Sequence, residues 1–380
     1  MSQVDYKPAL IEPTRRIVIK VGSAVLSDLD GLQIATIDHL AAQIDAIIRA
    51  GREVVLVTSG AIAAGRVRLG RRGASMAERQ AAAATGQIEL MRQWAKAFDA
   101  RGRTVAQILV THEDLAERKR RDNAIHTIQA LLAAGVLPIV NENDTVAVEE
   151  IRMGDNDVLS SLVAGMVQAG LLIILSDVAG VLTGDPRKRA DARLIPLITD
   201  AEAGMRGLVA ESAGPLGSGG MATKLKAARQ AAQAGISVII APGREAGTLS
   251  AAMDPAREIG TLILPSRTRL KGHKQWIAFA LRPAGALAVD DGAAEALRRK
   301  GRSLLATGIR EVRGDFASGD CVSLLDHAGV EFGRGLVNYP SIDVARLKGQ
   351  RSADIARLLG YKVADEIIHR NNFVLLEELA

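Results

Sequence analysis

The 380-residue sequence is poor in the residues that build covalent or metal-centred frameworks. A single cysteine, Cys321, excludes an intramolecular disulfide and leaves no second thiol for a structural zinc site. The six histidines are scattered outside every motif described below, so neither a metal cluster nor a nucleophilic triad is expected. We expect Cys321 to be a packed core side chain.

Long apolar runs are also missing. No stretch of about 18 uncharged apolar residues is present, and the segment before Ile17 has no apolar core of the signal-peptide kind. These absences predict a cytoplasmic protein. With 48% apolar and 24% charged residues, the composition is that of an ordinary globular protein, and the length predicts two domains.

A strong charge asymmetry is absent as well. The formal net charge is +5, but residues 276–380 contain 14 Lys and Arg against 14 Asp and Glu, and residues 1–275 contain 34 against 29. The distribution of charge indicates a partner better than the total does. The neutral last part of the chain therefore gives no electrostatic sign of nucleic-acid binding.

The first 260 or so residues alternate short β-branched runs with longer amphipathic stretches, which is typical of βα units and a largely parallel sheet. The runs predicted as strands are 16–21, 53–58, 104–110, 136–141, 171–176 and 237–241. The stretches predicted as helices are 32–50, 75–100, 123–134 and 224–234. Ser75 and Glu78 have the spacing of a capping box at the start of the second helix, and Gly51 follows the end of the first.

The composition and periodicity of the sequence change after Gly260. Residues 264–275 are polar, basic and aperiodic, as expected of a linker after a first domain of residues 1–263. Residues 276–370 form short, glycine-rich segments that suit a small β-rich domain, followed by a tail at 371–380. Two basic runs, 118–121 and 298–302, are interpreted as solvated surface, the first just before a helix and the second at a helix end.

Lys20 lies at the end of the first predicted strand, two residues before Gly22. The carboxyl ends of parallel strands are where α/β sheets bind ligands. Lys20 can meet a phosphate there, and Gly22 allows backbone amides to approach it closely. A solvated surface lysine is the alternative interpretation.

Polar side chains follow other predicted strands. Ser59 is either a ligand-contacting hydroxyl or a helix cap, and Ser176 and Asp177 end a strongly apolar strand. Residues 141–144 (NEND) close a further strand, and residues 154–157 (GDND) precede an apolar helix. Turns favour Asn and Asp in any protein. Two clusters so near each other can nevertheless bind an amino group, hold magnesium through water or orient a lysine.

The glycine-rich stretch 217–224 (GSGGMATK) opens a predicted helix and ends with Lys224. Backbone N–H groups at such a helix start favour anions, and Lys224 adds a full positive charge. No G-x-x-x-x-G-K-[ST] is present and no strand directly precedes the stretch, so neither a Walker loop nor a dinucleotide fingerprint is indicated. A flexible linker is the alternative.

These features suit phosphoryl transfer to a carboxylate. A carboxyl group with an ordinary pKa of about 4.3 is ionised at neutral pH, so it needs no general base. The transfer then depends on positioning and on charge neutralisation, which two lysines, magnesium and amide donors can supply.

The motifs KVGS, VTSGAIAAGR, NEND, GDND, LSDVAGV and GSGGMATK occur in order within roughly residues 15–262. Together they resemble the amino acid kinase family, in particular its members that act on glutamate. The resemblance implies an α/β fold with a largely parallel sheet sandwiched by helices, and an ATP- and Mg²⁺-dependent kinase. The implied product is L-glutamyl 5-phosphate, in the first step of proline biosynthesis. Proline as a feedback inhibitor and a homo-oligomer, dimer or tetramer, are also implied.

Residue roles carry over motif by motif. The resemblance implies that Lys20 and Lys224 contact ATP phosphates during transfer and that Asp157 orients both lysines. The implied glutamate-binding residues are Ser59, Asp144 and Asn156. The implied ATP-binding residues are Lys20, Ser176, Asp177, Ser218, Gly219, Gly220, Met221, Ala222, Thr223 and Lys224. The sequence departs from the family pattern at Ala24, Arg152 and Ser176, which leaves the fine geometry of phosphate binding open.

Residues 276–370 resemble a PUA domain, a small module of RNA-modifying enzymes, so RNA is a candidate partner. The neutral charge and the lack of an interleaved basic and aromatic platform argue against RNA binding. An RNA-binding protein with a vestigial kinase half is the alternative from another functional class. Among kinases, N-acetylglutamate, carbamate and a nucleoside monophosphate are the alternative acceptors.

Overall fold

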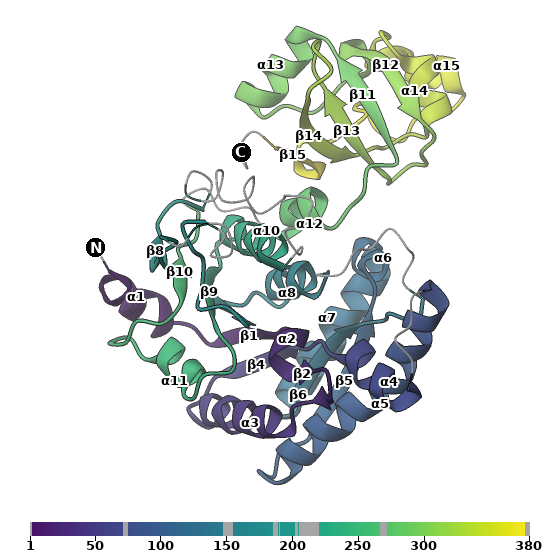
Figure 1. The fold of residues 1–380 in the computed structure, drawn as a ribbon. Helices are drawn as coiled ribbons and strands as arrows, with labels where there is room; N and C mark the ends of the chain where they lie inside the picture. The colour runs from purple at the N-terminus through teal and green to yellow at the C-terminus, as the bar shows by residue number, and fades with distance from the viewer. Residues whose placement is uncertain are drawn as a thin grey trace. The chain divides into compact units, whose positions relative to one another are not determined.

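The computed structural model describes residues 2–70, 75–146, 155–184, 189, 191–201, 204, 220–266 and 272–376. The chain divides into two compact units, Met1–Arg269 and Leu270–Ala380, each with its own hydrophobic core (Figure 1). The boundaries expected from the sequence at residues 263, 275 and 370, for the first domain, the linker and the second domain, stay predictions. Helix α12 (Gly272–Phe279) begins inside the expected linker, so the end of that segment is helical. No helix within the described ranges is long and apolar enough to cross a membrane.

The first unit is built on an eight-stranded sheet with the order β5-β6-β4-β1-β7-β9-β10-β8. In that order the strands are Val105–Val110, Leu137–Glu142, Glu53–Val57, Arg16–Val21, Leu171–Ser176, Ser237–Pro242, Thr261–Ile263 and Leu197–Ile198. All neighbouring strands are parallel except β9 and β10. The predicted largely parallel sheet is therefore confirmed, and each of the six predicted strands is present within a residue at either end.

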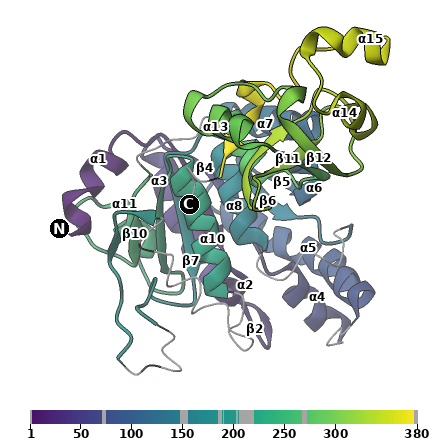
Figure 2. The same cartoon turned by 90° about the horizontal axis from the view of Figure 1, so that it is seen from above.

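Helices cover both faces of this sheet. Helices α8 and α10 lie side by side on one face, and α3 and α11 lie on the other (Figures 1 and 2). Among the described residues of the unit, the helices are α1 (Lys7–Ile11), α2 (Ser23–Leu26), α3 (Ile34–Arg49), α4 (Ala61–Leu69), α5 (Met76–Asp99), α6 (His112–Ala116), α7 (Arg118–Ala133), α8 (Asp155–Met166), α10 (Gly220–Gln233) and α11 (Thr248–Met253). A 3₁₀ turn (Gln3–Asp5) and a hairpin of β2 (Ser27–Asp28) and β3 (Gly31–Leu32) complete it.

The alternation of side chains along β1 decides where Lys20 points. Successive residues of a strand face opposite sides of the sheet. Ile17, Ile19 and Val21 belong to the buried cluster that includes residues of α3. Lys20 therefore faces the other side, where α8 packs against β1.

Local signals set the helix ends, with one correction. The capping box of α5 is confirmed: the hydroxyl of Ser75 accepts the backbone N–H of Glu78, and the Glu78 carboxylate accepts that of Ser75. Helix α7, expected to begin at Asn123, begins at Arg118, so the basic run is its first turn and does not precede it. The carboxylate of Glu117 caps this end by accepting two backbone N–H groups, which allows a helix to start on cations.

Helices α4 and α5 pack backbone to backbone. A Cβ atom on Gly65 would lie 1.8 Å from the carbonyl oxygen of Ala82, and one on Gly86 would lie 1.8 Å from that of Ala61. No side chain fits at either position. The two glycines therefore set the closeness of the two helices.

The second unit contains a five-stranded sheet with the order β12-β11-β13-β14-β15, which confirms the predicted β-rich domain. Its strands are β11 (Gly285–Val289), β12 (Ile309–Gly314), β13 (Cys321–Leu325), β14 (Glu331–Leu336) and β15 (Phe373–Leu375). Besides α12, its helices are α13 (Asp291–Lys300), α14 (Ser341–Leu347) and α15 (Ile355–Leu359), with 3₁₀ turns at Ala306–Gly308, Ser352–Asp354 and Arg370–Asn372.

Two predictions for single residues can be judged in this unit. Cys321 is a buried free thiol, and burial raises its pKa to about 12, which confirms a packed, unreactive side chain. Arg299 and Lys300 are exposed at the end of α13, as expected. Arg298 differs: it forms an ion pair with Asp326 and lies 4.3 Å from the ring centroid of Phe332.

Candidate active site

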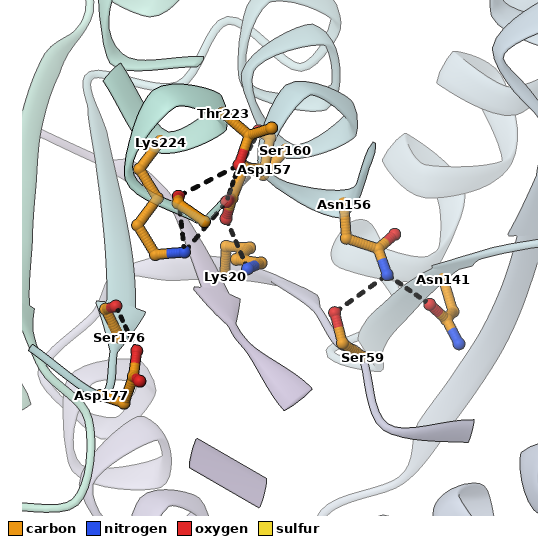
Figure 3. Close-up of polar contacts among 11 residues, drawn as sticks. Lys20, Ser59, Asn141, Asn156, Asp157, Ser160, Ser176, Asp177, Thr223 and Lys224 are labelled. Atoms are coloured by element: carbon orange, nitrogen blue, oxygen red, sulfur yellow. Dashed lines mark hydrogen bonds and ion pairs between the residues drawn. The ribbon is translucent and has the colours of Figure 1, made fainter. Parts of the chain in front are cut away.

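The ends of neighbouring parallel strands bring the predicted polar side chains to one edge of the sheet. Lys20 lies near the end of β1, Ser176 is the last residue of β7, and Ser59 follows β4 by two residues. Asn141 lies near the end of β6, the strand next to β4. Figure 3 shows these residues around the beginnings of α8 and α10. Residues far apart in the sequence thus meet, as the motif positions predicted.

Asp157 lies between two lysines. One of its carboxylate oxygens is paired with the ammonium of Lys20, and the other lies 3.1 Å from the ammonium of Lys224 (Figure 3). The three side chains come from β1, α8 and α10. The two amines therefore share one counterion, and the cluster carries one net positive charge when both lysines are protonated.

The cluster is buried. Lys20 is 4% exposed, Asp157 1% and Lys224 9%. Burial alone raises the pKa of Asp157, but the two ammonium groups outweigh it and hold that pKa below its usual value. Burial also lowers the pKa of Lys20; Asp157 opposes this shift, whereas the positive charge of Lys224 adds to it.

Several contacts fix the geometry of the cluster. The hydroxyl of Thr223 donates to Asp157 over 3.1 Å, and the Lys224 ammonium also donates to the carbonyl of Gly220. Ser161 of α8 donates to Gln230 of α10 over 2.9 Å, which holds the two helices in register. Each cation therefore reaches Asp157 from a fixed helix or strand.

Gly22 provides space next to Lys20. A Cβ atom at this position would lie 3.3 Å from the ammonium nitrogen of Lys20, so glycine leaves room for the folded-back lysine. This is a different use of Gly22 from the expected approach of backbone amides to a phosphate.

Ser176 and Asp177, which are expected to bind the nucleotide, lie on the opposite side of the two lysines from Ser59 and Asn156 (Figure 3). The hydroxyl of Ser176 is buried and donates to the carboxylate of Asp177 over 3.1 Å. Burial lowers the pKa of Lys20, and the nearby Asp177 carboxylate, like Asp157, opposes this lowering. Residues 220–224, which include the predicted ATP-binding Met221 and Ala222, form the start of α10. Ser218 and Gly219 lie outside the described residues.

Neutral amides surround the expected amino acid site. The Asn156 side-chain nitrogen donates to the hydroxyl of Ser59 over 2.9 Å and to the side-chain oxygen of Asn141 over 3.0 Å (Figure 3). The side-chain nitrogen of Asn141 in turn donates to Gln87 of α5 over 2.8 Å. Asp144, the third residue predicted to bind glutamate, is half-buried two residues beyond β6.

The structure decides three alternatives left by the sequence. Lys20 is not a solvated surface residue, because it is buried against Asp157. Ser59 is not a helix cap, since Gly60 occupies the cap position of α4 and no side chain caps that end. The described part of the glycine-rich stretch, from Gly220 onward, is helical and not a flexible linker.

No role was predicted for Gln87, and Asn141 was predicted only as a member of the NEND cluster. Asn141 carried a signal, because it begins the NEND cluster at a strand end. Gln87 carried none, since it lies within an Ala-rich amphipathic helix. Among the side chains that the structure describes, no group of three or more His, Cys, Asp or Glu residues is arranged to hold a metal ion.

The chain is similar to proteins of known activity over nearly its whole length. A model of the amino acid kinase family matches residues 15–242, and a PUA domain model matches residues 285–359. Glutamate 5-kinase from Pelobacter propionicus is 46% identical over 370 residues, covering 97% of this chain and 99% of that protein. Glutamate 5-kinase from Thermus thermophilus is 48% identical over 366 residues, covering 96% and 98%.

A solved structure is also similar to part of the chain. The crystal structure of UMP kinase from Bacillus anthracis has a TM-score of 0.47 and 18% identity, covering 67% of this chain and 98% of that one. The chain therefore belongs to the amino acid kinase family, among its glutamate 5-kinases, and carries a PUA domain after the kinase part.

Proposed function

We propose that this protein transfers the γ-phosphoryl group of ATP to the side-chain carboxylate of L-glutamate. The product is L-glutamyl 5-phosphate, and the reaction is the first step of proline biosynthesis. The observation that carries the proposal is the buried Lys20–Asp157–Lys224 cluster beside the amide network of Ser59 and Asn156. The full-length similarity to proteins named glutamate 5-kinase supports the choice of acceptor.

The chemistry needs no protein base. An oxygen of the ionised γ-carboxylate attacks the γ-phosphorus, and the bond from that phosphorus to the bridging oxygen breaks, so ADP leaves with the electron pair. Negative charge spreads over the transferring group as this happens. Lys20 and Lys224 neutralise it, and Asp157 holds the two like charges near each other before the nucleotide arrives.

Magnesium fits this site as a companion of the nucleotide. Both oxygens of Asp157 already face ammonium groups, which leaves that carboxylate poorly suited to a metal. Mg²⁺ usually keeps several waters and binds substrate phosphates, where it neutralises charge. We therefore assign its binding to ATP and water, with the exposed carboxylate of Asp177 as a candidate ligand.

The proposed residue roles are divided between the two substrates, ATP and glutamate. We assign Ser176, Asp177, the 218–223 stretch and both lysines to ATP, and Ser59, Asp144 and Asn156 to glutamate. Proline inhibition, a dimer or tetramer, a cytoplasmic location and an RNA partner for the PUA domain stay predictions from the sequence.

A coupled assay tests the acceptor. Purified protein with ATP, Mg²⁺, glutamate and hydroxylamine should form glutamyl hydroxamate, because hydroxylamine traps the acyl phosphate. Consumption of ATP with N-acetylglutamate, carbamate or a nucleoside monophosphate, and not with glutamate, would show that the acceptor is wrongly assigned.

A further inference from the structure

A backbone group fixes the orientation of the amides at the amino acid end of the site. The backbone N–H of Glu142 donates to the side-chain oxygen of Asn141 over 2.9 Å. A backbone N–H can only donate, so the oxygen of the Asn141 amide must face it and the nitrogen must face Gln87. The same oxygen also accepts from Asn156.

This orientation passes to both neighbours. Gln87 must turn its oxygen to Asn141, so its side-chain nitrogen Nε2 points elsewhere. Asn156 uses its nitrogen for Asn141 and Ser59, so its oxygen Oδ1 is left over. Both leftover atoms are buried, and neither has a hydrogen-bond partner among the residues that the structure describes.

A buried polar group without a partner is costly, which makes two of them in one hydrogen-bonded chain informative. They differ in kind: Gln87 offers a donor and Asn156 an acceptor. An α-amino acid presents the matching pair, a carboxylate that accepts and an ammonium that donates. The hydrogen bonds of Asn141 run to Glu142 and Gln87, away from the lysine cluster, so this feature is separate from the phosphate end.

Resting on the proposed function, we infer that Gln87 is part of the amino acid subsite. Its Nε2 group donates to the α-carboxylate of the substrate, while Oδ1 of Asn156 accepts from the α-ammonium group. Gln87 thus recognises the end of the substrate that does not react. It selects acceptors with a free α-carboxylate over shorter carboxylic acids that lack one.

Two substitutions at Gln87 separate direct contact from indirect positioning. Gln87→Met keeps the length but removes both polar atoms, and should raise the KM for glutamate about 10-fold. Gln87→Glu keeps an oxygen for Asn141 but replaces the donor by a negative charge, and should raise this KM on the order of 100-fold. The KM for ATP and kcat should stay within about threefold of the parent values.

A substrate lacking the recognised group gives an independent measure. 4-Aminobutyrate is glutamate without the α-carboxylate, so its inhibition constant against glutamate should change less than twofold or so in Gln87→Met. The matched control is Gln93→Met, at another buried glutamine of α5 whose amide contacts Glu89. It should leave both constants unchanged.

The outcomes are distinct. Rescue by Gln87→Glu, with a KM near that of the parent, would mean that Gln87 only positions Asn141 and would overturn the inference. Equal losses for glutamate and 4-aminobutyrate would mean general damage and would overturn it too. If the parent enzyme forms no hydroxamate from glutamate, the proposed function has failed first, before any variant is compared.

Discussion

The two ends of the candidate site differ in the charge of the side chains that form them. The phosphate end consists of full charges, with Lys20 and Lys224 paired to the single carboxylate of Asp157. At the amino acid end, where Asp144 is the one carboxylate assigned to glutamate, the hydrogen bonds join neutral groups, the hydroxyl of Ser59 and a chain of side-chain amides. The phosphate end is buried, whereas Ser59 and Asn156 at the amino acid end are half-buried, and both ends lie along the same strand ends.

The difference follows from what each end must recognise. Charge develops and moves on the transferring phosphoryl group, so fixed cations stabilise the transition state more than the ground state. The α-carboxylate and α-ammonium of the amino acid keep their charges throughout the reaction. Neutral donors and acceptors can bind them equally in both states, so the first end should govern kcat and the second KM.

Lys224→Ala should have the largest effect. Removing one preorganised cation should lower kcat by about 10²–10³-fold and change the KM for glutamate by less than about threefold. Steady-state kinetics measure both, with Lys226→Ala as the control, because Lys226 is an exposed lysine of the same helix. Near-normal turnover in Lys224→Ala would remove its assigned role.

Asn156→Ala should produce the opposite pattern. The variant loses an acceptor for the substrate and the contacts to Ser59 and Asn141, so the KM for glutamate should rise about 10- to 100-fold. The value of kcat at saturating glutamate should fall by less than about fivefold. Asn123→Ala, at an exposed position of α7, is the control. A lowered kcat with an unchanged KM would contradict the division between the two ends.

The pH dependence of kcat/KM for ATP should be determined by the ionisable groups at the phosphate end. Because the pKa of Lys20 is lowered from 10.5, kcat/KM for ATP should decline along an alkaline limb below that pH. Asp157→Asn removes the charge that raises this pKa, so the limb should move to lower pH. A limb at the position of a free lysine would show that Lys20 carries no proton needed for catalysis.

The same shift has a consequence for stability. Between the folded pKa of Lys20 and 10.5, the unfolded chain binds the extra proton, so the contribution of Lys20 to the free energy of unfolding increases with pH in that window. Asp157 gives a slope of the same sign, but at acid pH. Its lowered pKa stabilises the fold at neutral pH, and this contribution is lost as the pH falls through the folded pKa. Urea unfolding at several pH values measures both slopes.

Deleting the second unit should have the smallest effect. Both ends of the site come from residues before Arg269, the limit of the first unit. A chain ended at that residue should keep kcat and both KM values within about threefold. RNA binding by the full chain, measured at stated salt, together with no turnover in either the full or the shortened chain, would favour the RNA-binding alternative.

Sequence patterns predicted the sheet well because the β-branched runs, all but the half-exposed β5, are buried on both faces, and each has a glycine within two residues of an end. The short strands β8 and β10 escaped prediction, since two or three residues carry no periodic signal. The start of α7 was wrong because four consecutive basic residues are unfavourable in a first helical turn, and the compensating cap of Glu117 was overlooked.

The site was predictable where a residue stands at a strand end or a helix start. Lys20, Asn156, Asp157 and Lys224 all occupy such places, so topology brings them together. Gln87 does not, because its role depends on how α5 packs against α4 and on the direction of one backbone N–H. Such information resides in three-dimensional packing and not in local spacing.

The close packing of α4 and α5 has a consequence for how the enzyme can vary. Ser59 lies just before α4, and Gln87 directly follows Gly86, one of the two glycines at which the helix backbones touch. Because Gly65 and Gly86 have no side chains, the two helices can approach closely, and this approach sets the distance between Ser59 and Gln87. Even the methyl group of an alanine at Gly86 would meet the carbonyl oxygen of Ala61, so any substitution there must force the two helices apart and displace Gln87.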